Sequence, residues 1–234
     1  MAELVVAFDL PTGKEALTLA SRLPGLRWAK IGPVLYVREG PALVREFTAR
    51  GIRVFLDLKW HDIPSTVAGA VEGAREVGAS LATVHCLGGR AMLSAAQKAA
   101  GEPGSAGALS LVGVTVLTSH DAGGFEGVVG RGVPDLGSEV VRLARSARDA
   151  GLRGVVASGH EIGLLREALG TEPWLVVPGI RAPGAGAAAD DQARTVTPGE
   201  AVRRGATHLV VGRPITGSPD PQLAFRGVLE AMTT

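Results

Sequence analysis

Short apolar runs alternate with longer segments of helical periodicity along this chain. The apolar runs predict strands at residues 4–8, 28–32, 53–59, 81–85, 108–117, 154–157, 174–177 and 207–211. Apolar positions that recur with the period of a helix predict helices at residues 14–23, 41–50, 65–77, 90–100, 138–150, 160–169, 198–204 and 221–232. Each predicted strand is therefore followed by one predicted helix.

This strict alternation of strand and helix indicates a parallel sheet. Eight such units in a chain of 234 residues predict a (β/α)8 TIM barrel, with residues 1–234 as a single domain. A doubly wound open sheet is the alternative, but no G-x-G-x-x-G motif follows the first strand. No linker or change of composition divides the chain.

Polar or ionisable residues stand at the end of nearly every predicted strand. They are Asp9, Lys30, Asp57 with Lys59, His85, Thr118, Ser158, Arg181, and Gly212 with Arg213. In a (β/α)8 barrel the carboxyl ends of all strands meet at one face, where the active site forms. This concentration favours an enzyme, although the roles of His85 and Ser158 stay open.

The third strand carries the densest group of charges. Side chains alternate along a strand, so Phe55, Asp57 and Lys59 are expected on one face, whereas Asp62 lies beyond the strand. A lone D-x-K pair is more often a salt bridge that closes a strand end than a catalytic pair. The other charges at the same end of the barrel favour the catalytic interpretation.

The seventh and eighth strands run into P-G-I-R at residues 178–181 and V-G-R at residues 211–213. Loops at these two positions of a (β/α)8 barrel often bind phosphate, and arginine presents a planar fork to phosphate oxygens. A pair of ordinary surface arginines is the alternative. Residues 182–191 are dense in Ala and Gly, which fits either a lid over the phosphate or a disordered insert.

Composition narrows the class of protein. The net charge is +1, from 24 basic and 23 acidic residues, which argues against binding to nucleic acid or to a membrane surface. The single cysteine, Cys86, excludes an intrachain disulfide framework. With no signal-peptide pattern and no apolar run of membrane-spanning length, we expect a cytoplasmic protein.

Residues 57–64 read DLKWHDIP and resemble the D-x-K-x-x-D-I-P signature of the orotidine 5'-phosphate decarboxylase family. Further segments that resemble this family, in order, lie at residues 7–9, 30–32, 114–119, 178–181, 191–194 and 211–215. The resemblance implies decarboxylation of orotidine 5'-phosphate to uridine 5'-phosphate and CO2, the last step of de novo UMP synthesis. It also implies that the reaction uses neither a metal ion nor a cofactor.

The resemblance implies roles for individual residues as well. Lys59 would protonate C6 of the pyrimidine, within a network of alternating charges made by Lys30, Asp57, Lys59 and Asp62. Asp62 and Thr66 would reach into the partner subunit's active site, so a homodimer would be part of the mechanism. The other implied substrate contacts are Asp9 at the ribose, Thr118 at the pyrimidine, Gln192 between base and phosphate, and Arg181, Gly212 and Arg213 at the phosphate.

Two alternatives remain at this level. Related barrels that act on sugar phosphates share D-x-K-x-x-D but typically use magnesium, with an acidic residue where this chain has Lys30. A non-catalytic barrel that binds a nucleotide phosphate would keep the two arginines and lack one of the four network charges. All four charges are present, which favours the decarboxylase.

Overall fold

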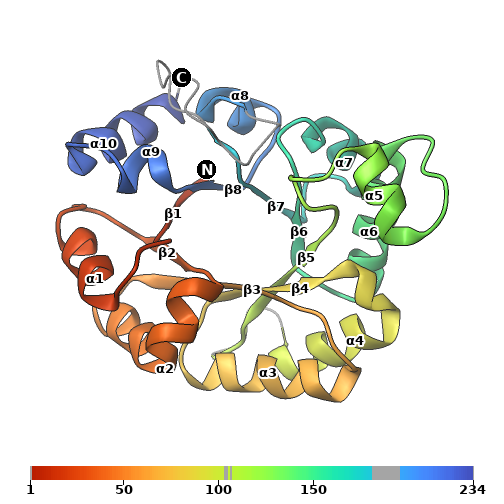
Figure 1. Ribbon diagram of the computed structural model, residues 1–234, viewed down its shortest axis with the longest axis horizontal. Coiled ribbons are helices and arrows are strands. Elements are labelled where there is room, and N and C mark those ends of the chain that lie inside the picture. Colours follow the sequence, from red (N-terminus) through yellow and green to blue (C-terminus); the bar gives the residue numbers. More distant parts are fainter. Residues whose placement is uncertain (1, 103–104, 106, 181–195, 234) are drawn as a thin grey trace.

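Eight parallel strands form a closed ring at the centre of the molecule. The computed structural model describes residues 2–102, 105, 107–180 and 196–233. The strands are β1 (Glu3–Ala7), β2 (Trp28–Ile31), β3 (Arg53–Trp60), β4 (Leu81–His85), β5 (Ser110–Val114), β6 (Gly154–Val156), β7 (Trp174–Val177) and β8 (His208–Val211). They pair in chain order, and β8 pairs with β1 (Figure 1). The predicted (β/α)8 barrel is confirmed.

Helices surround this ring on the outside (Figure 1). They are α1 (Gly13–Ser21), α2 (Pro33–Ala49), α3 (Pro64–Glu76), α4 (Gly89–Ala100), α5 (Ala122–Val129), α6 (Leu136–Asp149), α7 (Ile162–Leu169), α8 (Pro198–Arg203), α9 (Arg213–Thr216), α10 (Pro221–Ala231) and the 3-10 helix η1 (Cys86–Gly88). Side chains of Thr12, Asp135 and Asp220 accept hydrogen bonds from backbone N–H groups at helix starts, as N-caps do. Within the described ranges, no helix combines the length and apolar character needed to cross a membrane.

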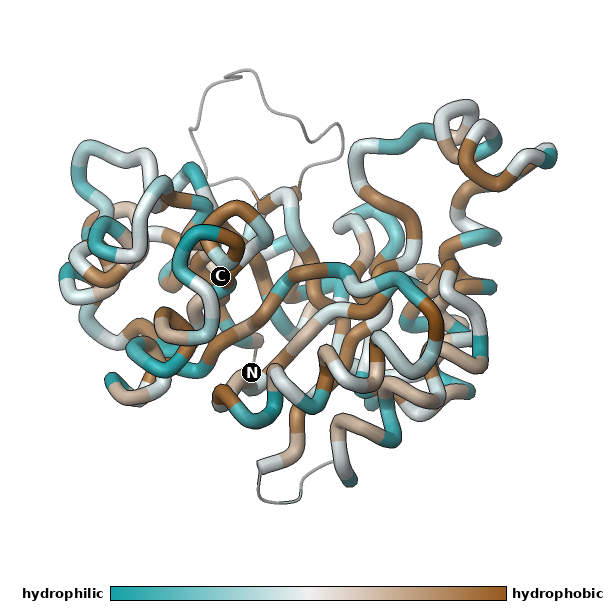
Figure 2. The backbone as a smooth tube through the Cα atoms, turned by 60° about the horizontal axis from the view of Figure 1, so that its bottom comes forward, coloured by the Kyte–Doolittle hydropathy of each residue, from teal (hydrophilic) through white to brown (hydrophobic). Residues whose placement is uncertain are grey.

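The barrel has two apolar layers. One lies between strands and helices, and the other fills the inside of the ring with Val5, Ala7, Trp28, Phe55, Leu81, Val112, Val176 and Val210. These inner residues follow the alternation of side chains along each strand. In Figure 2 the apolar stretches run through the strands in the middle of the molecule, and hydrophilic stretches lie mostly in outer segments.

The amino end of the barrel is filled by aromatic and cationic side chains. His208 is buried between two tryptophans, with ring centroids 5.5 Å from Trp28 and 4.5 Å from Trp174. The guanidinium groups of Arg53 and Arg153 lie over Trp28 and Trp174 at 4.3 and 5.1 Å. Burial lowers the pKa of His208 to about 4, so the imidazole is neutral near pH 7.

The structure corrects the bounds of one predicted strand and one predicted helix. The fifth strand, predicted to run over residues 108–117, is shorter (Ser110–Val114), because its neighbour β6 ends at Val156, the partner of Val114. The helix predicted at residues 41–50 is the second part of α2, which begins at Pro33 and kinks at Gly40 (φ 62°). An apolar run indicates which residues are buried. The length of the strand also depends on how far the neighbouring strand continues, which the run does not show.

Two α-helices of the described residues were absent from the sequence prediction, as was the short 3-10 helix η1. Residues 121–136 show little core pattern, yet they contain α5, which Asp121 caps and which buries Phe125. Residues 213–216 form the short helix α9 directly after β8. The segment at residues 182–191, predicted to be a lid or an insert, lies outside the described residues.

Candidate active site

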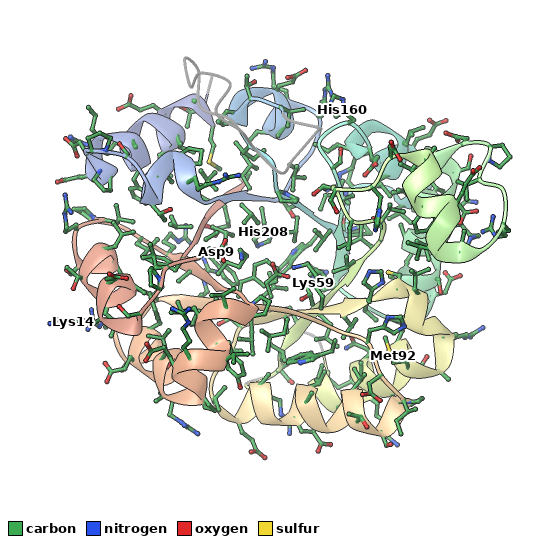
Figure 3. All side chains as sticks on the ribbon, in the orientation of Figure 1. Asp9, Lys14, Lys59, Met92, His160 and His208 are labelled. Carbon is green, nitrogen blue, oxygen red and sulfur yellow. The ribbon has the colours of Figure 1, made fainter. Side chains whose placement is uncertain are left out.

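A cavity of about 550 Å³ opens at the carboxyl end of the strands. Its lining includes Asp9, just after β1, with Lys30 on β2 and Asp57 and Lys59 on β3, and Thr118 and Arg213 from across the barrel. Figure 3 shows Asp9 and Lys59 within the ring of strands, whereas Lys14, Met92 and His160 lie outside it. Apolar residues such as Phe55 and Val176 form the floor that separates this cavity from the amino end.

Four of the lining side chains form a row of alternating charges. The Lys30 ammonium lies 3.1 Å from Asp9 Oδ1 and 3.5 Å from Asp57 Oδ2. The other oxygen of Asp57, Oδ1, accepts a hydrogen bond of 2.9 Å from Lys59 Nζ. Each interior charge therefore has an opposite charge on both sides, which offsets the free energy of burying it.

Burial differs along this row. The Lys30 and Asp57 side chains are 10% and 14% exposed, whereas that of Lys59 is 37% exposed and reaches into the cavity. Burial raises the pKa of Asp57, but the charges of Lys30 and Lys59 and the hydrogen bonds from Lys59 and Thr83 outweigh it and lower that pKa below its usual value. Asp57 is therefore a fixed negative charge beside Lys59, the more exposed of the two lysines that line the cavity.

The backbone of Lys59 is strained. Its φ is 51°, and it is the only non-glycine residue with positive φ among those the structure describes. A side chain in this region costs about 1–3 kcal/mol and persists only where surrounding contacts enforce it. The strain coincides with an irregularity in β3, where pairing with β4 shifts between Leu56 and Trp60.

Thr83 on β4 contacts both Lys59 and Asp57. The Lys59 N–H donates to Thr83 Oγ1 at 2.8 Å, and the hydroxyl donates to Asp57 Oδ1 at 3.1 Å. Thr83 is fully buried. Reasoning from the sequence did not single it out. The available signal was the alternation of side chains along β4, which places a polar residue, Thr83, on the face opposite to Ala82 and Val84.

Asp62 and Thr66 lie apart from the row of charges. Both side chains are exposed, Asp62 in the loop after β3 and Thr66 in the first turn of α3. Asp62 Oδ1 accepts a hydrogen bond of 2.6 Å from the N–H of Ile63, which is itself 63% exposed. The structure thus brings Lys30, Asp57 and Lys59 together, and it places Asp62 on the surface, apart from them.

The residues expected around the phosphate are partly described. Gly212 and Arg213 line the cavity where β8 passes into α9, and Thr118 lines it after β5. Arg181 and Gln192 lie outside the described residues, so their expected contacts with the substrate stay predictions.

Two polar residues at strand ends do not line this cavity. The ring of His85 stacks on His61 with centroids 5.4 Å apart, and burial, with the nearby His61 and Lys59 charges, lowers its pKa to about 4. Ser158 is buried, and its hydroxyl accepts a hydrogen bond from the N–H of His160. In the part of the chain that the structure describes, no group of three or more His, Cys, Asp or Glu side chains is placed to hold a metal ion.

Known proteins resemble this chain over nearly its full length. The orotidine 5'-phosphate decarboxylase of Opitutus terrae is 50% identical over 229 residues, which cover 97% of this chain and 96% of that relative. The enzyme of the same name from Alkalilimnicola ehrlichii is 49% identical over 225 residues, covering 96% of this chain and 93% of the relative.

Comparison with solved structures gives the same resemblance. The crystal structure of orotidine 5'-phosphate decarboxylase from Lactobacillus acidophilus matches with a TM-score of 0.87 and 30% identity, covering all of both chains. The family model for "Orotidine 5'-phosphate decarboxylase / HUMPS family" matches residues 2–228. With this match and relatives of such identity, the chain belongs to the orotidine 5'-phosphate decarboxylase / HUMPS family.

Proposed function

We propose that this protein converts orotidine 5'-phosphate to uridine 5'-phosphate and CO2, with Lys59 as the proton donor. The family and the relatives' names support a carboxy-lyase that acts in UMP biosynthesis. The observation that carries the finer proposal is the row Asp9–Lys30–Asp57–Lys59, which ends in an ammonium inside a cavity of about 550 Å³. Such a cavity has the size of small-molecule sites in proteins.

The reaction breaks one bond and forms another. The bond between C6 and the carboxylate carbon breaks, CO2 leaves, and the electron pair of that bond stays on C6. The Lys59 ammonium offsets this developing negative charge and then transfers a proton to C6, so that uridine 5'-phosphate forms. The resulting neutral amine regains a proton from water, which balances the reaction at one proton consumed per CO2 released.

The buried neighbours of Lys59 keep its ammonium in place. Asp57 stays ionised because its pKa is lowered, and it holds Lys59 Nζ at 2.9 Å. Lys30 balances the charge of Asp57 on the far side and links it to Asp9, whose more exposed carboxylate is available to the ribose. Charges arranged before the substrate arrives need no reorganisation when charge develops in the transition state.

The phosphate end of the substrate would lie across the barrel from Lys59. Arg213 and Gly212 line that side of the cavity, and Thr118 is available to the pyrimidine. The family resemblance adds Arg181 and Gln192 to these contacts. Binding energy from a phosphate far from C6 can be used to orient the reacting carboxylate against Asp57 and Lys59.

We also propose a homodimer in which Asp62 and Thr66 complete the partner's site. In one chain these side chains are exposed and stand apart from the row of charges, next to the exposed Ile63. An exposed apolar side chain bordered by polar ones fits the rim of an interface between subunits, which is polar and surrounds an apolar core. The proposal also includes a single domain over residues 1–234, a cytoplasmic location, and a reaction without metal or cofactor.

Turnover of orotidine 5'-phosphate, followed by its ultraviolet absorbance, tests this function. We expect wild-type protein to consume the substrate and Lys59→Ala to lose about 10³-fold or more in kcat. Lys98→Ala, on the exposed face of α4, is the matched control and should keep full activity. An inactive wild type, or a fully active Lys59→Ala variant, contradicts the proposal.

The same assay separates this function from that of a magnesium-dependent sugar-phosphate enzyme. Activity should be unchanged after treatment with EDTA and dialysis. Loss of activity that added Mg²⁺ restores would favour the alternative, because a carboxylate-bound divalent ion would then stabilise the intermediate.

A further inference from the structure

We propose that Thr83 is a positioning residue for this reaction, whose hydroxyl fixes the backbone of Lys59 and the carboxylate of Asp57 relative to each other. This inference deepens the proposed function and rests on it. Thr83 does not line the cavity, so it acts through these two residues and does not touch the substrate.

The hydroxyl of Thr83 closes a ring of three hydrogen bonds. It accepts from the Lys59 N–H at 2.8 Å and donates to Asp57 Oδ1 at 3.1 Å, and Lys59 Nζ donates to that same Oδ1 at 2.9 Å. Both ends of Lys59, its backbone nitrogen and its ammonium, are therefore linked through one carboxylate oxygen. Of the uncharged side chains, a hydroxyl is suited to this place because one oxygen both accepts and donates.

The irregular backbone of β3 makes this contact necessary. Leu56 pairs with Ala82, and pairing resumes with Trp60 opposite Val84, so β3 has two more residues than β4 over this interval. Lys59 lies in this bulge with φ 51°, and its N–H bonds to a side chain in place of the strand ladder. Thr83 is 0% exposed, so solvent does not reach this position to take over the hydrogen bonds of its hydroxyl.

Loss of the hydroxyl has a defined consequence for Lys59. The Lys59 N–H loses its acceptor, and the strained backbone loses the contact that opposes relaxation. A relaxed backbone moves the ammonium away from the position that Asp57 and Lys30 define. Since a displacement of about 1 Å at a reacting group can cost 10²-fold in rate, the effect should appear in kcat and not in substrate binding.

The test compares two hydroxyl-free variants with a conservative one. Thr83→Val keeps the shape, and Thr83→Ala cannot overpack the barrel; each should lower kcat by about 10²-fold while KM stays within about 3-fold. Thr83→Ser keeps the hydroxyl and should recover most of the wild-type kcat. The matched control is Thr115→Val, since Thr115, directly after the next strand, β5, is equally buried but donates to Val156 O, away from the charges.

A second readout does not depend on turnover. The chain has only four lysines, so selective [13Cε]-lysine labelling gives a simple NMR spectrum in which the Lys59 signal is identified by its absence from Lys59→Arg. Thr83→Val or Thr83→Ala should shift this signal, whereas Thr83→Ser and Thr115→Val should leave it in place. If the wild type does not decarboxylate orotidine 5'-phosphate, the proposed function fails, and the NMR comparison still decides the role of Thr83.

Three results would overturn the inference. The first is an unchanged kcat in both hydroxyl-free variants. The second is a Lys59 signal that does not move in them. The third is a parallel loss of kcat and of uridine 5'-phosphate binding in Thr83→Val and Thr115→Val alike, because that pattern reports general damage to the barrel.

Discussion

The Lys30 ammonium lies 3.5 Å from Asp57 Oδ2 and is the more buried cation of the two that flank this carboxylate. Lys30 also contacts Asp9 at 3.1 Å, so one ammonium serves two carboxylates. Without it, Asp9 and Asp57 would face each other as like charges, and Asp57 would lose one of the charges that lower its pKa.

Replacing Lys30 with methionine tests this arrangement. The side chain keeps a similar length and loses its charge, so the pKa of Asp57 should rise and its carboxylate should hold Lys59 less firmly. We expect kcat to fall by about 10²-fold or more. The control is Lys14→Met. Lys14 is exposed on α1, outside the ring of strands (Figure 3), so this variant should keep wild-type activity. A fully active Lys30→Met variant would contradict this, because it would show that Lys59 alone keeps Asp57 ionised and in place.

Mixing two inactive variants tests the shared active site. Lys59→Ala and Asp62→Ala should each be inactive alone. After co-refolding in equal amounts, half of the dimers are mixed, and each mixed dimer has one site with both native residues, so about a quarter of wild-type activity should return. Activity that does not return, or a monomer in sedimentation analysis, would place Asp62 in its own chain's site or outside catalysis.

The fold could be predicted because its signal is periodic. Strands β4 and β7 have the predicted bounds. The other strands begin or end at slightly different residues than predicted, and β5 is shorter than predicted because its neighbour β6 is short. The charges at the strand ends could be predicted to meet because parallel strands in a closed barrel all end on one face. Asp9, Lys30, Asp57 and Lys59 do meet there.

Contacts that depend on local backbone geometry could not be predicted in this way. Alternation places Lys59 on the same face as Asp57, but it assumes regular φ and ψ, whereas Lys59 lies in a bulge with positive φ. The hydrogen bonds of Thr83 follow from that bulge. Helix α5 was missed for another reason, because glycines at residues 123, 124 and 127 obscure the pattern that buries Phe125.

Removing the guanidinium of Arg213 should weaken phosphate binding. Arginine donates charge-assisted hydrogen bonds to phosphate, each worth about 1.5–3 kcal/mol, so Arg213→Ala should raise KM by about 10–100-fold. Steady-state kinetics should show a smaller effect on kcat, and Arg226→Ala, exposed on α10, is the control. An unchanged KM would contradict the proposed place of the phosphate.

Acid should destabilise the barrel through His208. Its pKa is about 4 in the folded protein and near 6.5 in an unfolded chain, so the unfolded state binds more protons between these values. The contribution of His208 to stability is intact above pH 6.5 and is lost progressively as the pH falls toward 4. For a shift of this size the loss reaches about 3 kcal/mol in the free energy of unfolding, an upper value.

Urea denaturation at a series of pH values measures this loss. His208→Gln has no titrating group, so its free energy of unfolding should fall less steeply between pH 6.5 and 4 than that of the wild type, even where its value at pH 7 is lower. His160→Gln is the matched control, because His160 is exposed and its replacement should leave the slope unchanged. Equal slopes in wild type and His208→Gln would mean that the aromatic cluster accommodates an imidazolium, with Glu3 as the nearby charge that favours it.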